Sequence, residues 1–242
     1  MQRFFFDNET IIDNAFEVTG EKHNHIVRVL RMSVGEVVVF CDKCGTDYEC
    51  ELVSATKEKA EFKVLTSYEN KTEPSLKITL FQCMPKGEKL DEAVKRCVQF
   101  GVTKITPVIS RRCVARPDKK ALAKKVERLN KISLSSAMQC MRGIVPEVCD
   151  AVDFKTAIDL MAGYDNAFVC YESEKNLLIN KLEIKGNTLA ILVGPEGGID
   201  ESEAEYAISK GIECLSLGKR ILRTEDAGAF AIPIFLSMTD NL

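Results

Sequence analysis

The chain has 242 residues, of which 45% are hydrophobic and 29% charged, a balance typical of a folded protein with a core and not of a disordered chain. Its length fits one large domain or two modest ones. No apolar run reaches the roughly 20 residues that span a bilayer, and the start of the chain lacks the apolar segment of a secretory signal, so we expect a cytoplasmic protein with no membrane partner.

The formal net charge of −3 hides an uneven distribution along the chain. Residues 111–142 contain ten basic and two acidic side chains, a net charge of +8, so the rest of the chain carries −11. A concentrated basic stretch can pair with phosphates while the acidic remainder limits nonspecific binding. The alternative is a solvated helix face, which is the commoner outcome for an isolated basic run.

Ten cysteines lie between Cys41 and Cys214, and without an export signal their scatter favours free thiols in a reducing cytosol. Cys41 and Cys44 with Cys50 resemble half of a zinc site. Because no second Cys-x-x-Cys or His pair completes that pattern, we expect no metal.

Alternating apolar residues predict short strands in the first part of the chain, over residues 36–40, 48–53 and 60–65. Glycines and charged turns separate these strands, and their spacing suits a small β-barrel or a compact sheet. Residues 70–74 form the expected linker.

After the linker, strands and helices alternate. Residues 76–83 form a predicted strand, apolar residues at helical spacing follow over 90–98, and Gly101 is a predicted helix C-cap. A helix beginning near Pro117 follows the strand at 104–109, with an apolar stripe at Leu122, Val126, Leu129, Ile132 and Ser136. The remaining predicted elements are strands at 167–171, 188–193 and 213–217 and helices at 154–162, 200–210 and 227–238. This alternation predicts an α/β domain with a mostly parallel sheet.

Two of the predicted strands end in glycine loops, which begin at Gly194 and at Gly218. In open α/β sheets, ligands bind beyond the carboxyl ends of the strands. Several glycines allow main-chain groups to approach a ligand closely, which suits a nucleoside; the alternative is an ordinary tight turn. Since the chain has no GxGxxG or GxxxxGK[ST] pattern, NAD and ATP are disfavoured.

Several motifs together resemble one known family, the ribosomal RNA small subunit methyltransferase E family. The strongest are residues 193–198 (Val-Gly-Pro-Glu-Gly-Gly) and 217–225 (Leu-Gly-Lys-Arg-Ile-Leu-Arg-Thr-Glu). Weaker similarities at residues 3–5, 25–31, 82–87 and 127–142 extend the resemblance over nearly the whole chain. Motifs in the same order are far more specific than any one of them alone.

The resemblance implies a PUA-like RNA-binding β-barrel over residues 1–70 and a SPOUT methyltransferase domain with a deep trefoil knot over 75–242. It also implies a homodimer that uses S-adenosylmethionine to methylate N3 of a uridine in 16S ribosomal RNA, within the small ribosomal subunit. The residues that it implies for the cofactor are Tyr171, Leu192, Val193, Gly194, Pro195, Glu196, Gly197, Gly198, Leu217, Gly218, Arg220, Ile221, Leu222 and Thr224, with Glu172 at the edge.

Methyl transfer to N3 requires loss of the uracil proton, and arginines near the pocket could stabilise the resulting charge. We assign this role to Arg220 or Arg223, with Glu225 orienting an arginine. On spacing alone, this charged cluster would be a surface salt-bridge network. The residues expected to contact RNA are Arg3, Arg28, Arg31, Lys86, Arg111, Arg128, Gln139 and Arg142.

The sequence departs from the family pattern at three places: Asp226 replaces an expected Thr, Leu129 a usual Trp, and Cys140-Met141 a frequent Ser-Gly. Two other functions stay open on the residues alone. One is a non-catalytic RNA-binding ribosome assembly factor, and the other is a nucleotide-binding metabolic enzyme, which the missing phosphate motifs disfavour.

Overall fold

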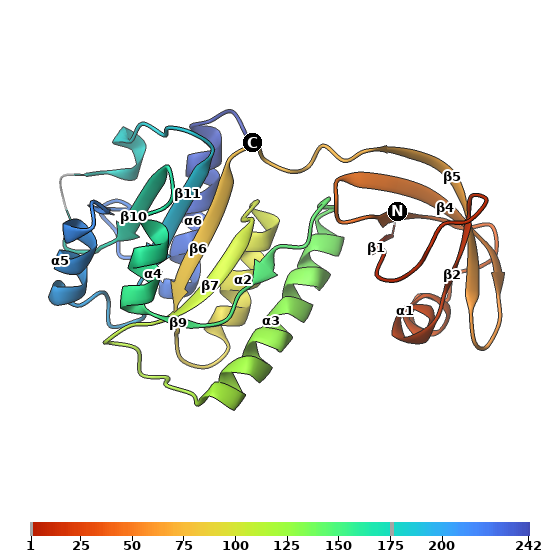
Figure 1. Cartoon of the computed structure of the whole chain (residues 1–242), viewed down its shortest axis with the longest axis horizontal. Coiled ribbons are helices and arrows are strands. Elements are labelled where there is room, and N and C mark those ends of the chain that lie inside the picture. The colour runs from red at the N-terminus through yellow and green to blue at the C-terminus, as the bar shows by residue number, and fades with distance from the viewer. Residues whose placement is uncertain (1, 175–176) are drawn as a thin grey trace. The chain divides into compact units, whose positions relative to one another are not determined.

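The computed structural model describes residues 2–174 and 177–242 and divides the chain into two compact units. The first unit contains the residues up to Glu73 and a later segment, Ala137–Val145; the second contains Pro74–Ser136 and Pro146–Leu242. Figure 1 shows the elements of each unit along the colour gradient.

The first unit is built on a five-stranded sheet of order β1-β3-β4-β5-β2, in which β1 and β3 are parallel and the other pairs antiparallel. Its strands are β1 (Arg3–Phe5), β2 (Ala15–Val18), β3 (Val37–Cys41), β4 (Thr46–Ala55) and β5 (Ala60–Glu69). Two short helical segments, α1 (Gly20–Asn24) and the π-helix η1 (His25–Val29), follow β2. Strands β3, β4 and β5 confirm the three strands that alternation predicts.

Aromatic side chains form the core of this unit. Phe4 stacks on Phe40 with ring centroids 5.3 Å apart, and Phe16 stacks on Phe62 at 5.5 Å. All four rings are nearly or fully buried. Stacked and edge-to-face pairs add to the burial of apolar area, so these phenylalanines hold the sheet together although β1 and β2 are only three and four residues long.

The segment Ala137–Val145, which the sequence placed in the C-terminal domain, belongs to the first unit because Glu73 binds it closely. Arg142 Nε and Nη2 donate to Glu73 Oε1 and Oε2 at 3.1 and 2.5 Å, and the Gly143 amide donates to Oε1 at 2.9 Å. Met138 also packs against the aromatic core. The chain therefore returns to its first unit after most of the long helix α3 (Lys119–Gln139).

The second unit contains a six-strand path of order β12-β10-β11-β6-β7-β8, with β9 also paired to β7, and every pairing is parallel. Its strands are β6 (Lys77–Cys83), β7 (Lys104–Ile109), β8 (Glu147–Val148), β9 (Val152–Asp153), β10 (Asn166–Cys170), β11 (Thr188–Val193) and β12 (Glu213–Leu215). This confirms the predicted mostly parallel α/β sheet.

Helices cover the sheet on both faces, as Figure 1 shows: α2 and α6 lie side by side behind it, and α4 lies in front. The helices of this unit, besides most of α3, are α2 (Lys89–Gln99), α4 (Phe154–Met161), the 3-10 helix η2 (Ile179–Lys181), α5 (Glu201–Ser209) and α6 (Thr224–Ser237). At Gly228 of α6, an added Cβ would lie 3.1 Å from Leu80 of β6 and 3.3 Å from Cys97 of α2, so glycine allows close packing there.

Local signals in the sequence place several helix ends correctly. Asp200 and Glu203 form the predicted capping box at the start of α5, and Gly101 follows α2 with a φ of +94°. On α3 the predicted apolar stripe is the less exposed face, with Leu129 fully buried. Among the described residues, no helix combines the length and apolar composition needed to cross a membrane.

Candidate functional site

The carboxyl ends of four parallel strands meet at one edge of the second unit's sheet. Cys170 at the end of β10 pairs with Val193 of β11 and Leu215 of β12, and Val193 pairs with Gln82 of β6. A cavity of about 530 Å³ opens at this edge, within the size range of small-molecule sites. Its walls are Lys89, Cys170–Glu172, Val193–Gly198, Ser216–Glu225 and Ala227.

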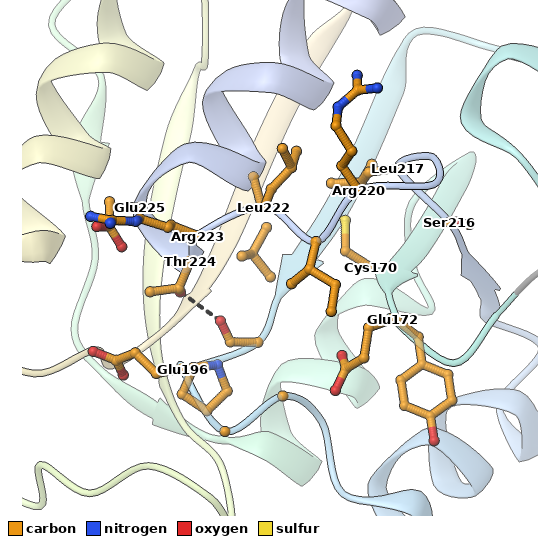
Figure 2. Close-up of a pocket in the computed structure, with 18 of the residues that line it drawn as sticks. Cys170, Glu172, Glu196, Ser216, Leu217, Arg220, Leu222, Arg223, Thr224 and Glu225 are labelled. Atoms are coloured by element: carbon orange, nitrogen blue, oxygen red, sulfur yellow. Dashed lines mark hydrogen bonds between the residues drawn. The ribbon is translucent and has the colours of Figure 1, made fainter.

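Thr224 joins the two glycine loops that form most of this wall. Its hydroxyl donates a hydrogen bond to the Gly194 carbonyl at 2.6 Å, drawn as the dashed line in Figure 2, and accepts one from Gln82 Nε2 at 2.9 Å. Thr224 and Gln82 are both buried. Since buried polar groups are costly to leave unpaired, this chain of hydrogen bonds fixes the position of one loop against the other.

Gly198 closes the first loop beneath the carboxylate of Glu172. Its φ is +70°, a conformation that residues with a Cβ rarely adopt, and a Cβ built there would lie 1.9 Å from Glu172 Oε1. The positive φ favours glycine, and with any larger residue the exposed Glu172 carboxylate would have to move, so the close approach of the loop to Glu172 depends on this residue.

Two carboxylates of the cavity wall face Lys89, and their surroundings differ. Lys89 Nζ lies 2.9 Å from Glu196 Oε1 and 3.9 Å from Glu225 Oε2, and the Lys86 amide donates to Glu196 Oε1 at 3.1 Å. Partial burial opposes ionisation of Glu196, but the hydrogen bonds from Lys89 and Lys86 outweigh it and lower the pKa of that carboxyl. Glu196 is exposed, whereas Glu225 is buried.

The two arginines of the second loop point in different directions. In Figure 2 the side chain of Arg220 extends away from Thr224 and Glu225, whereas that of Arg223 extends to the same side as Glu225. Both arginines are exposed and line the cavity. Of the two, Arg223 is therefore the better placed to act beside Glu225.

The structure brings together nearly all residues that the sequence assigned to the cofactor and to catalysis. Leu192 is the exception: it is fully buried within β11 and does not line the cavity, because its side chain belongs to the core. Sequence reasoning missed Lys89, Cys170, Ser216, Lys219 and Ala227 as lining residues. The signal that could have indicated Cys170 and Ser216 was their position near the carboxyl ends of the predicted strands at 167–171 and 213–217.

Two of the arginines expected to contact RNA are buried in ion pairs instead, which corrects that prediction. Arg3 Nη1 and Nη2 donate to Asp47 Oδ2 and Oδ1 at 2.9 and 2.5 Å, and the side chain has no exposed surface. Arg142 is 3% exposed and pairs with Glu73 as described above. Each guanidinium faces a carboxylate inside the first unit, so neither presents its charge to a phosphate.

The other residues expected to contact RNA are exposed. Arg28, Arg31 and Gln139 lie on the surface of the first unit, and Lys86, Arg111 and Arg128 on that of the second. Three of them are also tied to acidic neighbours: Arg128 Nη2 donates to Asp91 Oδ1 at 2.7 Å, the Arg111 amide to Glu203 Oε1 at 2.8 Å, and the Lys86 amide to Glu196 Oε1 at 3.1 Å.

The three departures from the family pattern have structural roles. Asp226, in the first turn of α6, pairs with Arg96 of α2 and so links the two helices. Leu129 is fully buried on α3, and Cys140 is half-buried after that helix with its thiol 3.8 Å from the Ala137 carbonyl. None of the three lines the cavity.

All ten cysteines fall in the described part of the chain, and each is a free thiol. Cys41 and Cys50 are buried and Cys44 is exposed. Residues 2–174 and 177–242 contain no group of three or more His, Cys, Asp or Glu side chains arranged to hold a metal ion.

Two family models match the chain, and they correspond to the two parts of the fold. An RNA methyltransferase PUA domain matches residues 18–65, and an RNA methyltransferase domain matches residues 72–236. Fold and site therefore define an RNA methyltransferase with a SPOUT-type catalytic domain and an N-terminal PUA-like domain.

Individual relatives show which family of RNA methyltransferases the chain belongs to. The ribosomal RNA small subunit methyltransferase E of Bacillus subtilis is 34% identical over 100% of this chain and 98% of its own. The Neisseria gonorrhoeae protein of the same name, solved bound to S-adenosyl methionine, has a TM-score of 0.88 at 30% identity and 98% coverage of both chains. A putative methyltransferase from Legionella pneumophila, also solved with this cofactor, has a TM-score of 0.89 at 26% identity, covering 97% of this chain and 96% of its own. The chain belongs to the ribosomal RNA small subunit methyltransferase E family.

Proposed function

We propose that this chain transfers the methyl group of S-adenosylmethionine to N3 of one uridine in 16S ribosomal RNA. The observation that carries the proposal is the cavity between two glycine loops at the carboxyl edge of the parallel sheet. Family membership adds the reaction class, and the relatives solved with S-adenosylmethionine add the cofactor. The uracil N3 position rests on the family resemblance of the two loop motifs.

The residues of the cavity fit an adenosyl thioether. Gly194, Gly197 and Gly218 have no side chain that would keep a nucleoside away from the main chain of the two loops. The Gly194 and Gly197 carbonyls accept hydrogen bonds from Thr224 and Arg112, which hold the first loop in place. A Cβ at Gly218 would meet no atom within 4 Å, which leaves open space beside that loop. Val193, Leu222 and Ala227 supply apolar surface in the same wall. These two loops would hold the cofactor, which supplies an electrophilic methyl carbon when bound.

Besides binding the cofactor, the site must orient the target uracil and stabilise the negative charge that forms on it. Loss of the N3 proton leaves negative charge on the carbonyl oxygens of the uracil, and a nearby guanidinium stabilises such charge. Arg223 supplies that guanidinium in our proposal, because in Figure 2 it extends to the same side as Glu225, whereas Arg220 extends away.

The same proposal specifies how the protein contacts its RNA substrate. The RNA within the small ribosomal subunit contacts the exposed residues Arg28, Arg31, Lys86, Arg111, Arg128 and Gln139, and phosphates pair with the lysines of α3. A homodimer and a trefoil knot around the cavity are further predictions from the family resemblance, and the cytoplasmic location stays a prediction from the sequence.

Mass spectrometry of 16S ribosomal RNA tests the proposed reaction directly. RNA from a strain lacking the gene should miss one 3-methyluridine, and complementation should restore it. An unchanged set of methylated nucleotides would contradict the proposal. Calorimetry with S-adenosylhomocysteine separates the enzyme from a non-catalytic assembly factor, because only the enzyme requires a stoichiometric cofactor site. Family membership favours the enzyme over that alternative.

Gly198→Ala should weaken binding of S-adenosylhomocysteine, because the new Cβ displaces the Glu172 carboxylate from its position in the cavity wall. The matched control is Gly211→Ala, since Gly211 has a similar φ of +78° but no atom within 4 Å of the position that its new Cβ would take. Both variants should lose about 1–2 kcal/mol of stability through backbone strain. Calorimetry should show weakened affinity only for Gly198→Ala; equal affinities would rule out a role for this contact.

RNA affinity should fall steeply as salt rises, because the exposed basic side chains release counterions when they pair with phosphates. Filter binding with a 16S ribosomal RNA fragment at several salt concentrations measures the slope. Lys124→Ala on the exposed face of α3 should reduce that slope by about one. A salt-independent affinity would show that RNA binding does not depend on phosphate contacts.

A further inference from the structure

Methylation at N3 requires a group that accepts the uracil proton, since N3 is protonated at neutral pH. The cavity wall contains three carboxylates, of Glu172, Glu196 and Glu225, and one thiol, of Cys170. Burial raises the pKa of the Cys170 thiol, which leaves it protonated. The choice of acceptor is therefore among the carboxylates.

The three carboxylates differ in burial and in hydrogen bonding, and these differences show which of them is suited to accept a proton. Glu196 already accepts hydrogen bonds from Lys89 and from the Lys86 amide, and its lowered pKa makes it a poor base. Glu172 is exposed to solvent and lies over Gly198. Glu225 is only 9% exposed, and its Oε2 atom is buried without a hydrogen-bond donor among the described residues.

A buried carboxylate oxygen without a donor costs free energy, so its presence in a native site requires an explanation. Lys89 Nζ, 3.9 Å from Glu225 Oε2, and the first turn of α6 place positive potential beside the carboxylate without occupying that atom. An N–H group of a bound base would supply the missing donor.

We propose that Glu225 Oε2 is the acceptor of the N3 proton of the target uracil. This rests on the proposed function and extends it, because it makes Glu225 a catalytic residue and not only an orienting group for an arginine. The N3–H bond breaks and the proton goes to Glu225; the N3 electron pair forms the bond to the methyl carbon. The carbon–sulfur bond breaks with its electron pair on sulfur, leaving a neutral thioether, and Glu225 returns its proton to water.

The test compares Glu225→Gln with the wild type in single-turnover methylation of 16S ribosomal RNA across pH 6–9. The rate at pH 7 should fall about 100-fold or more, the range of general-base effects, and should then rise about tenfold per pH unit as solvent takes over deprotonation. The affinity for S-adenosylhomocysteine, measured by calorimetry, should stay unchanged. Glu92→Gln, an exposed carboxylate paired with Lys95 on α2, is the matched control and should keep the wild-type rate.

Other outcomes would overturn the assignment. A wild-type rate and pH profile in Glu225→Gln would exclude Glu225 as the base, and a defect confined to S-adenosylhomocysteine affinity would make it a cofactor contact. If Glu225→Gln fails to fold by circular dichroism, Glu225→Asp takes its place: a slower rate with the wild-type pH profile supports the base, and a wild-type rate opposes it. If the wild type itself forms no 3-methyluridine, the proposed function fails instead.

Discussion

Asp47→Ala should lower the free energy of unfolding of the first unit by about 3–5 kcal/mol, the cost of leaving a buried charge without its partner. Arg3 has no exposed side-chain surface, and Asp47 is its only ion-pair partner of those the structure describes. Asp47 also accepts a hydrogen bond from Asn70 Nδ2 at 2.8 Å. Urea unfolding followed by circular dichroism measures the loss.

The matched control is Glu17→Ala in the same sheet, because Glu17 pairs with Lys59 at the surface. Exposed pairs contribute about 0–1 kcal/mol. Equal unfolding midpoints for the two variants would show that the Arg3–Asp47 pair adds nothing. The double variant Arg3→Met with Asp47→Leu should regain much of the stability, since apolar residues of similar volume often replace a buried pair without loss.

Thr224→Val should weaken S-adenosylhomocysteine binding about tenfold to a hundredfold. Valine keeps the shape of threonine but leaves the Gly194 carbonyl without its donor and one N–H of Gln82 Nε2 without its acceptor, while Nε2 still donates to the Cys83 carbonyl at 3.2 Å. Each unpaired buried group costs about 1–3 kcal/mol. The cavity loops can avoid this cost only by moving apart. Calorimetry measures the affinity.

Thr224→Ser keeps the hydroxyl and should bind S-adenosylhomocysteine nearly as the wild type does. Circular dichroism would show whether either variant changes the fold. If Thr224→Val bound the ligand with wild-type affinity, the hydrogen bond between the loops would have no part in shaping the cavity.

The cavity could be predicted from the sequence because its determinants are local. Two strand ends followed by glycines place Gly194 and Gly218 at the same edge of a parallel sheet, and the family motifs supply the neighbouring positions. Leu192 does not line the cavity, because a range of motif residues does not distinguish a side chain in the core from one in the wall.

The ion-pair partners of the basic residues could not be predicted from the sequence. Arg3 and Arg142 look like any other surface arginine in the sequence, but their partners Asp47 and Glu73 lie 44 and 69 positions away. Such pairings depend on the tertiary fold and not on spacing. Short strands are similarly difficult: β8 and β9 have two residues each, too few for any alternation to be seen.

The return of Ala137–Val145 to the first unit has a consequence for biosynthesis. Until Arg142 has left the ribosome, Glu73 lacks the guanidinium that neutralises it, and Met138 is missing from the aromatic core. The nascent N-terminal unit must therefore wait for more than half of the polypeptide to be translated before it can reach its final packing. Its maturation is thus coupled to synthesis of the strands and helices that come between.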